Sequence, residues 1–125
     1  MAFLAVALVT GCSSAGEPDV VIVPETAPPV QDEGESRKRA EEFRESMSGA
    51  PGMRDLAGEV TGVYGDWEGD GHRAFIVTGL KGAEATKRNG ERIAEAFAAW
   101  DESDEGRSKV AVYDGEGDLL SDRDF

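Results

Sequence analysis

Apolar residues recur at helical spacing in two segments of the chain. In the first segment Ala40, Phe43 and Met47 share one stripe, and Asp32 followed three residues later by Glu35 forms the capping box that opens a helix. The second segment runs from about residue 84 to residue 100. Its stripe consists of Thr86, Gly90, Ile93, Phe97 and Trp100. Both segments predict amphipathic helices, and the glycine within the second stripe indicates that this helix approaches the sheet closely.

A period of two replaces the helical period between these segments. Residues 60–64 alternate in side-chain character, and residues 73–80 are centred on the β-branched and aromatic run Phe75-Ile76-Val77. Both stretches therefore predict strands. The acidic turn at residues 66–71 would join them into a hairpin.

Two further strands are expected after the second helix. Residues 109–113 predict the first, and a turn at residues 114–117 leads into a short last strand around Leu119. This order of elements predicts a two-layer α+β domain with both helices on one face of an antiparallel sheet. The expected core residues are Phe43, Phe75, Val77, Ile93, Phe97, Trp100, Val110 and Val112.

The first residues of the chain predict export. Residues 2–9 are apolar, too few to span a bilayer, and small residues follow them. The sequence Val9-Thr10-Gly11-Cys12 resembles the lipobox of bacterial lipoproteins. This resemblance implies cleavage between Gly11 and Cys12 and acylation of the Cys12 thiol, which would hold the protein on the extracytoplasmic face of the cell membrane.

An alternative interpretation makes Cys12 a buried thiol in a core helix. The residues after the apolar run, Thr-Gly-Cys-Ser-Ser and then prolines, are poor helix formers, which favours the lipoprotein interpretation. Signal peptides usually open with Lys or Arg, and no charged residue precedes Cys12. We therefore expect the true start codon to lie upstream.

The sequence predicts three parts: a signal peptide at residues 1–11, the lipidated cysteine with a proline-rich acidic tether at residues 12–31, and a small acidic α+β domain at residues 32–125. Within the tether, residues 20–23 form the run Val-Val-Ile-Val. Two interpretations of this run stay open, an edge strand docked on the domain and a short apolar patch in a linker.

The charge of the chain limits its partners. The formal net charge of −13 argues against nucleic acid and against anionic headgroups, because both would be repelled by most of the surface. Attachment to the membrane is therefore expected through the lipid on Cys12, where each buried methylene contributes about 0.8 kcal/mol. The other expected partner is an envelope protein or a cell-wall component.

Two resemblances concern the domain. Its last third looks like an uncharacterised family of small exported actinobacterial proteins, which implies export and a helix-strand ending but no catalytic residues. The residues that carry this likeness are Ile93, Ala94, Ala96, Phe97, Trp100, Val110, Val112, Tyr113, Gly117, Leu119, Leu120 and Phe125. The element order, with Val77-Thr78-Gly79 at a strand end, is similar to the BON domain of envelope proteins. That similarity implies a module that binds lipid or envelope components.

Candidate catalytic chemistry is limited to the only histidine, His72, and the carboxylates beside it. The sequence contains no Gly-x-Ser-x-Gly elbow, and one imidazole with no second cysteine excludes a structural zinc site. We therefore expect a non-catalytic binding domain. An envelope hydrolase that uses His72 with a nearby carboxylate is the alternative.

The sequence Asp66-x-Glu68-x-Asp70-Gly71 reproduces the first half of an EF-hand calcium loop. The twelfth position of such a loop should be a bidentate glutamate, but here it is Val77 in a predicted strand. An acidic hairpin turn without cofactor is therefore the favoured interpretation. The alternative is a weak calcium site completed by Asp114, Glu116 or Asp118.

Overall fold

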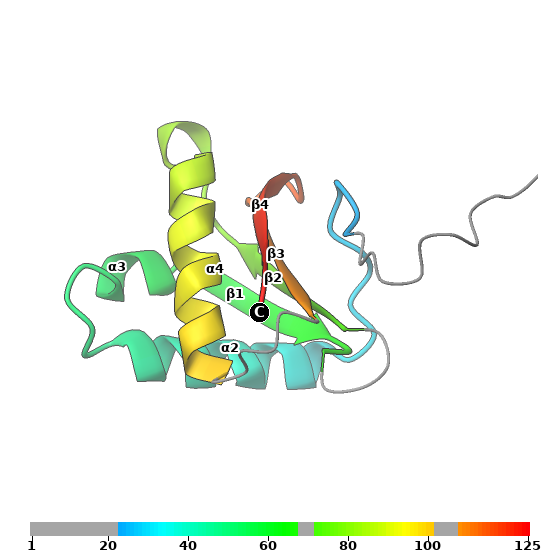
Figure 1. Cartoon of the computed structure of the whole chain (residues 1–125), viewed down its shortest axis with the longest axis horizontal. Coiled ribbons are helices and arrows are strands. Elements are labelled where there is room, and N and C mark those ends of the chain that lie inside the picture. Colours follow the sequence, from blue (N-terminus) through cyan, green and yellow to red (C-terminus); the bar gives the residue numbers. More distant parts are fainter. Residues whose placement is uncertain (1–22, 68–71, 102–107) are drawn as a thin grey trace, which may run out of the picture.

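The computed structural model describes residues 23–67, 72–101 and 108–125 (Figure 1). The sequence-based expectations for residues 1–22, Glu68, Asp70 and Gly71 lie outside this part of the chain. The elements, in chain order, are α2 (Glu33–Met47), α3 (Arg54–Ala57), β1 (Val60–Gly65), β2 (Arg73–Thr78), the 3-10 turn η3 (Gly82–Glu84), α4 (Lys87–Asp101), β3 (Lys109–Tyr113) and β4 (Leu119–Asp124).

The expected capping residue opens α2. The Asp32 carboxylate accepts a hydrogen bond from the Glu35 amide at 3.0 Å, and one turn later Glu35 pairs with Arg39 at 2.9 Å. Acidic residues in the first turn also stabilise the helix, because their negative charge lies at the positive end of the helix dipole. The helix ends at Met47, and the amide of the capping residue Ser48 donates to the Glu45 carbonyl.

The four strands form one sheet in the order β1-β2-β3-β4. The β1/β2 and β3/β4 pairs are antiparallel, whereas β2 and β3 are parallel. The sheet is therefore mixed, and the expectation of a purely antiparallel sheet is wrong at its centre. The reason is α4, which lies between β2 and β3 in the chain and returns it to the end of the sheet where β2 began. The α+β class itself is confirmed.

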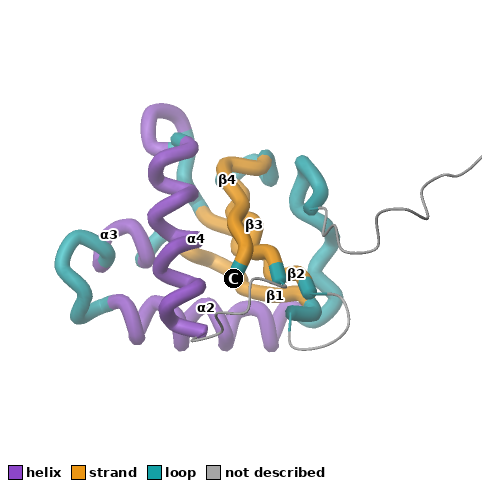
Figure 2. The backbone as a smooth tube through the Cα atoms, viewed as in Figure 1, coloured by secondary structure: helices purple, strands orange, loops and turns teal. Residues whose placement is uncertain are grey.

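Both helices contribute to a single core. α2 packs along β1, and α4 packs on β3 and β4 (Figures 1 and 2). Ala40 and Phe43 from α2 share the core with Ile93, Ala94 and Phe97 from α4. The two helices thus bury one apolar layer against one face of the sheet.

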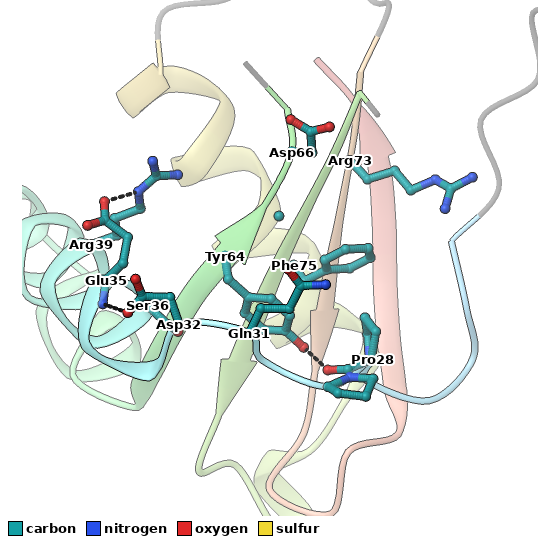
Figure 3. A pocket seen from close by; sticks show the side chains of 12 residues that line it. Pro28, Gln31, Asp32, Glu35, Ser36, Arg39, Tyr64, Asp66, Arg73 and Phe75 are labelled. Carbon is teal, nitrogen blue, oxygen red and sulfur yellow. Dashed lines mark hydrogen bonds and ion pairs between the residues drawn. The ribbon is translucent and has the colours of Figure 1, made fainter. Parts of the chain in front are cut away.

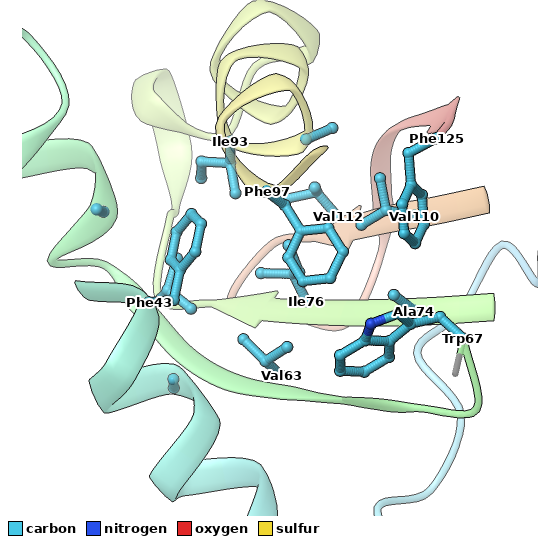
Figure 4. Packing of buried hydrophobic residues seen from close by; sticks show 14 of the residues in the cluster. Phe43, Val63, Trp67, Ala74, Ile76, Ile93, Phe97, Val110, Val112 and Phe125 are labelled. Carbon is cyan, nitrogen blue, oxygen red and sulfur yellow. The ribbon is translucent and has the colours of Figure 1, made fainter. Parts of the chain in front are cut away.

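Phe97 occupies the centre of this core (Figure 4). Its ring centroid lies 6.3 Å from Phe43, 5.4 Å from Trp67, 5.6 Å from Trp100 and 5.3 Å from Phe125. These contacts join α2, the turn after β1, α4 and the chain end. A single side chain therefore holds together elements that are distant in the sequence.

Most of the expected core residues lie in this layer. Fully buried among them are Phe43, Ile93, Phe97, Val110 and Val112. Trp100 is half-buried and packs against the edge of the core.

Phe75 and Val77 differ from the expectation. In β2 the core-facing residues are Ala74 and Ile76, and Phe75 and Val77 lie half-buried on the opposite face. Because successive side chains of a strand alternate between faces, only one of the two sets can face the helices. The apolar run of this strand is continuous, so the sequence alone does not show which of the two sets faces the helices.

The glycine in α4 marks a close approach to β4, as its position in the helical stripe indicates. A Cβ built on Gly90 would lie 2.8 Å from the Leu120 Cβ and 3.1 Å from the Ser121 Cβ. Gly90→Ala should therefore lower the free energy of unfolding by about 1 to 3 kcal/mol, even though alanine raises helix propensity by about 1 kcal/mol. Urea melts of the full chain measure this difference.

Gly34→Ala in α2 is the matched control. The Cβ it adds would have the Asp32 Oδ1 at 3.5 Å as its nearest neighbour, which is an ordinary contact. We expect the stability of this variant to be unchanged or slightly raised. A Gly90→Ala chain as stable as wild type would contradict the close packing of α4 on β4.

Candidate functional site

Residues 23–31, which we call the strap, cross the face of the sheet opposite the helices. Thr26 forms an antiparallel bridge with Asp118. The Ala27 amide donates to the Gly117 carbonyl at 2.8 Å, and the Leu119 amide donates to the Glu25 carbonyl at 2.9 Å. The described part of the predicted tether is therefore hydrogen-bonded to the domain.

Two tyrosines under the strap add further bonds. The Tyr113 hydroxyl donates to the Pro24 carbonyl at 2.7 Å, and the Tyr64 hydroxyl donates to the Pro28 carbonyl. Extended proline-rich segments leave their carbonyls without internal partners, so these oxygens are available to such donors. The strap is thus held at two carbonyls, four residues apart.

The two tyrosines belong to an aromatic row on the helix-free face, formed by Tyr64 of β1, Phe75 of β2 and Tyr113 of β3. Adjacent ring centroids are 5.4 Å and 6.3 Å apart. Tyr113 is fully buried, whereas Tyr64 and Phe75 are half-buried. The aromatic row therefore forms a continuous apolar floor across three strands.

Burial keeps both phenols protonated. It raises the pKa of Tyr64, and it raises the pKa of Tyr113 even more, with smaller contributions from the charges of Tyr64 and Asp122. A protonated phenol can donate a hydrogen bond, whereas a phenolate cannot. Both side chains thus remain donors to the strap over the ordinary pH range.

A pocket of about 580 Å³ opens between the strap, the start of α2 and strands β1 and β2 (Figure 3). Tyr64 and Phe75 lie at its centre in this view, with Pro28 and Gln31 of the strap over them. The described residues that line it are Pro28, Pro29, Gln31, Asp32, Glu35, Ser36, Arg39, Tyr64, Gly65, Asp66, Arg73 and Phe75. We call this cavity the strap pocket. Aromatic surface with a few polar groups at the rim is typical of ligand sites, and the volume lies in the usual range of about 300 to 1,000 Å³.

The residues of the predicted acidic turn are only partly described. Asp66 lines the strap pocket, and its carbonyl accepts from the His72 amide at 3.0 Å. His72 has a positive φ of 55°, and it is not among the residues that line the strap pocket. The structure therefore does not bring His72 and Asp66 side chains together in that pocket.

Of the expected alternative calcium ligands, the Asp114 side chain is bonded within the β3/β4 turn. The Asp114 carboxylate accepts from the amides of Glu116 at 2.8 Å and Asp118 at 3.0 Å. Within residues 23–67, 72–101 and 108–125, no three His, Cys, Asp or Glu side chains are grouped to hold a metal ion. Glu68 and Asp70 lie outside these ranges, so the weak calcium site stays a prediction.

The lipidation residues Gly11 and Cys12 also lie outside the described residues. In the part of the chain that the structure covers, no helix combines the length and apolar character needed to cross a membrane. Comparison of the chain with protein-family models, curated proteins and solved structures gives no match. Function must therefore be inferred from the site itself.

Sequence reasoning did not identify the strap pocket. Prolines at positions 24, 28 and 29 favour a free tether, and the apolar run of residues 75–77 predicts Phe75 in the core. The available signal was the alternation of β1 and β3, which puts Tyr64 and Tyr113 on the same face as Phe75. Three aromatic residues on the face opposite the helices indicate that something covers them.

The raised tyrosine pKa values predict alkaline destabilisation. From about pH 10 the unfolded chain releases its phenolic protons while the folded chain keeps them, so the free energy of unfolding should fall as the pH rises. In Tyr113→Phe this fall should be shallower. The variant should also be about 1 kcal/mol less stable near pH 8, because a hydrogen bond to the strap is lost.

Urea melts of wild type and Tyr113→Phe between about pH 8 and pH 11 measure both effects, with the range chosen to bracket the ordinary tyrosine pKa. Tyr64→Phe combined with Tyr113→Phe provides the control, since the chain then contains no tyrosine. Equal pH slopes for wild type and Tyr113→Phe would show that Tyr113 is not buried under the strap.

Proposed function

We propose that this chain is an exported lipoprotein, anchored to the membrane through lipid on Cys12, whose acidic α+β domain binds an envelope component without catalysing a reaction. The lipobox-like sequence Val9-Thr10-Gly11-Cys12 supports the anchor. The strap pocket supports the binding role and is the single observation that carries it.

The chemistry of the strap pocket favours binding over catalysis. Tyr64 and Phe75 offer aromatic surface. The polar groups at the rim already have partners within α2, since Asp32 accepts from the Glu35 amide and Glu35 pairs with Arg39. The only histidine of the chain, His72, is not part of this lining. A hydrolase using His72 therefore gains no support from the pocket.

The position of the strap in the chain limits where the ligand can be. Residues 12–23 would connect the acylated cysteine to the strap, and a chain of that length spans at most about 40 Å when fully extended. The strap pocket would then lie within about that distance of the membrane surface. The ligand is accordingly an envelope component close to the membrane.

A photo-crosslinking residue in place of Gln31 tests this proposal. Gln31 is exposed and lines the strap pocket, so a bound ligand should be captured there when cells that produce the full chain are irradiated. The matched control places the same residue at Lys38, which is exposed on α2 and does not line the pocket. We expect a specific adduct from position 31 only.

Two results would count against the binding role. One is equal labelling at positions 31 and 38, which would reflect random contact with the domain surface. The other is an adduct at position 31 that persists unchanged when Tyr64→Ala removes the floor of the pocket.

A further inference from the structure

The strap lies on the aromatic row in the way that proline-rich peptides lie on their receptors. Such receptors offer a groove of aromatic side chains to a preformed extended segment. Here the groove is the aromatic row, and its two hydroxyls bind the carbonyls of Pro24 and Pro28. The strap is in this sense a ligand supplied by the chain itself.

The strap lies outside the apolar core, so its displacement would leave the contacts of that core in place. None of residues 23–31 is buried, whereas Tyr113 beneath them is. The strap has no side chain in the apolar core between the helices and the sheet. Its attachment rests on the two hydroxyl bonds and on backbone bonds to Gly117 and Leu119.

We propose that the aromatic row is a binding site for an extended, proline-containing segment of another envelope protein, which displaces residues 23–28 of the strap from it. Gln31 directly precedes Asp32, the cap of α2, and stays at the strap pocket when these residues leave. The inference rests on the proposed binding role and names the class of partner.

Recognition requires proline carbonyls that have no partner within the segment. The Tyr64 and Tyr113 hydroxyls would donate to these carbonyls, as they now do to Pro28 and Pro24. It also requires an extended backbone to pair beside the β3/β4 turn, where Thr26 now pairs with Asp118.

The strap competes with any partner segment, so the wild-type chain should bind such a segment weakly. The apparent dissociation constant is the intrinsic constant divided by the fraction of molecules in which the strap is released. A change that releases the strap should therefore raise affinity without adding a contact. Ala27→Pro is such a change, because it removes the amide that donates to the Gly117 carbonyl.

The probe is a fluorescent peptide with the sequence of residues 23–31, and its anisotropy is measured with the full chain in detergent. We expect it to bind Ala27→Pro about tenfold or more tightly than wild type, as the fraction of released strap rises. A control peptide with alanine at the positions of Pro24, Pro28 and Pro29 should bind at least about tenfold more weakly than the proline peptide. Adding Tyr64→Phe and Tyr113→Phe to the Ala27→Pro chain should weaken binding again.

A second measurement avoids any dependence on Ala27→Pro. Excess peptide added to the wild-type chain should speed hydrogen exchange at the Ala27 amide, because the peptide displaces the strap. Unchanged exchange at saturating peptide would overturn the proposal, as would equal binding of the alanine control peptide. A wild-type dimer in light scattering that dissociates on adding the peptide would assign the site to the strap of a second copy, and would also overturn it.

The two proposals fail separately. A crosslink at position 31 that depends on Tyr64, together with no peptide binding, would leave the binding role standing and remove only the proline-containing partner. Absence of that crosslink would remove the binding role itself.

Discussion

Phe97→Ala is expected to lower the free energy of unfolding by about 3 to 5 kcal/mol. The Phe97 ring is fully buried and meets four other aromatic rings, so its removal leaves a cavity that several elements border. A domain of this size has only about 5 to 15 kcal/mol of stability in total. The variant should therefore unfold at a much lower urea concentration than wild type.

Phe75→Ala is the matched control for this prediction. It removes the same atoms from a half-buried ring on the opposite face of the sheet, where the strap rather than a helix lies over the aromatic row. Its cost should be clearly smaller, since part of the ring already contacts solvent. An equal loss of unfolding free energy in the two variants would show that Phe75 faces the core in place of Ala74 and Ile76.

Cys12→Ser is expected to abolish acylation completely. Serine has no thiol to receive the lipid, and Cys12 is the only cysteine of the chain. Cells producing either chain are grown with a clickable fatty acid, and the purified proteins are compared for label. Wild type should carry the label and remain with the membrane fraction, while Cys12→Ser should carry none and leave that fraction.

Ser13→Ala serves as the control, because it alters the neighbouring position and leaves the thiol in place. It should be labelled like wild type. Label on Cys12→Ser equal to that on wild type would end the lipoprotein proposal, and the binding role of the domain would then need another route to the envelope.

Local signals in the sequence were reliable where one residue determines the geometry. Asp32 and Glu35 predicted the start of α2 because a cap needs only a side chain and the amides beside it. The glycine at position 90 predicted a close helix-strand contact, because the absence of a Cβ atom lets two backbones approach each other. The strand at residues 109–113 has the bounds that its pattern predicts.

Features that depend on distant partners could not be predicted in this way. The parallel pairing of β2 with β3 depends on the path of α4, and the face that Phe75 occupies depends on which side the helices cover. Trp67 belongs to a predicted acidic turn, yet it is nearly buried, packs on Phe97 and donates to Asp101 at 3.1 Å. Its burial is set by tertiary contacts and not by local pattern.

The candidate site was missed for the same reason. Prolines favour an extended backbone both in a free linker and in a docked segment, so composition does not separate the two. Only the positions of Tyr64 and Tyr113 in the folded sheet show that the prolines at 24 and 28 have partners.

The strap also has a consequence for the order of folding. Its bond from Pro24 to Tyr113 joins residues 89 positions apart, and its backbone pairs with the turn that precedes the last strand. Closing so long a loop costs entropy that only the assembled sheet can offset. A chain exported from its N-terminus would therefore bring the strap across the membrane first and dock it last, after β3 and β4 have formed the surface on which it lies.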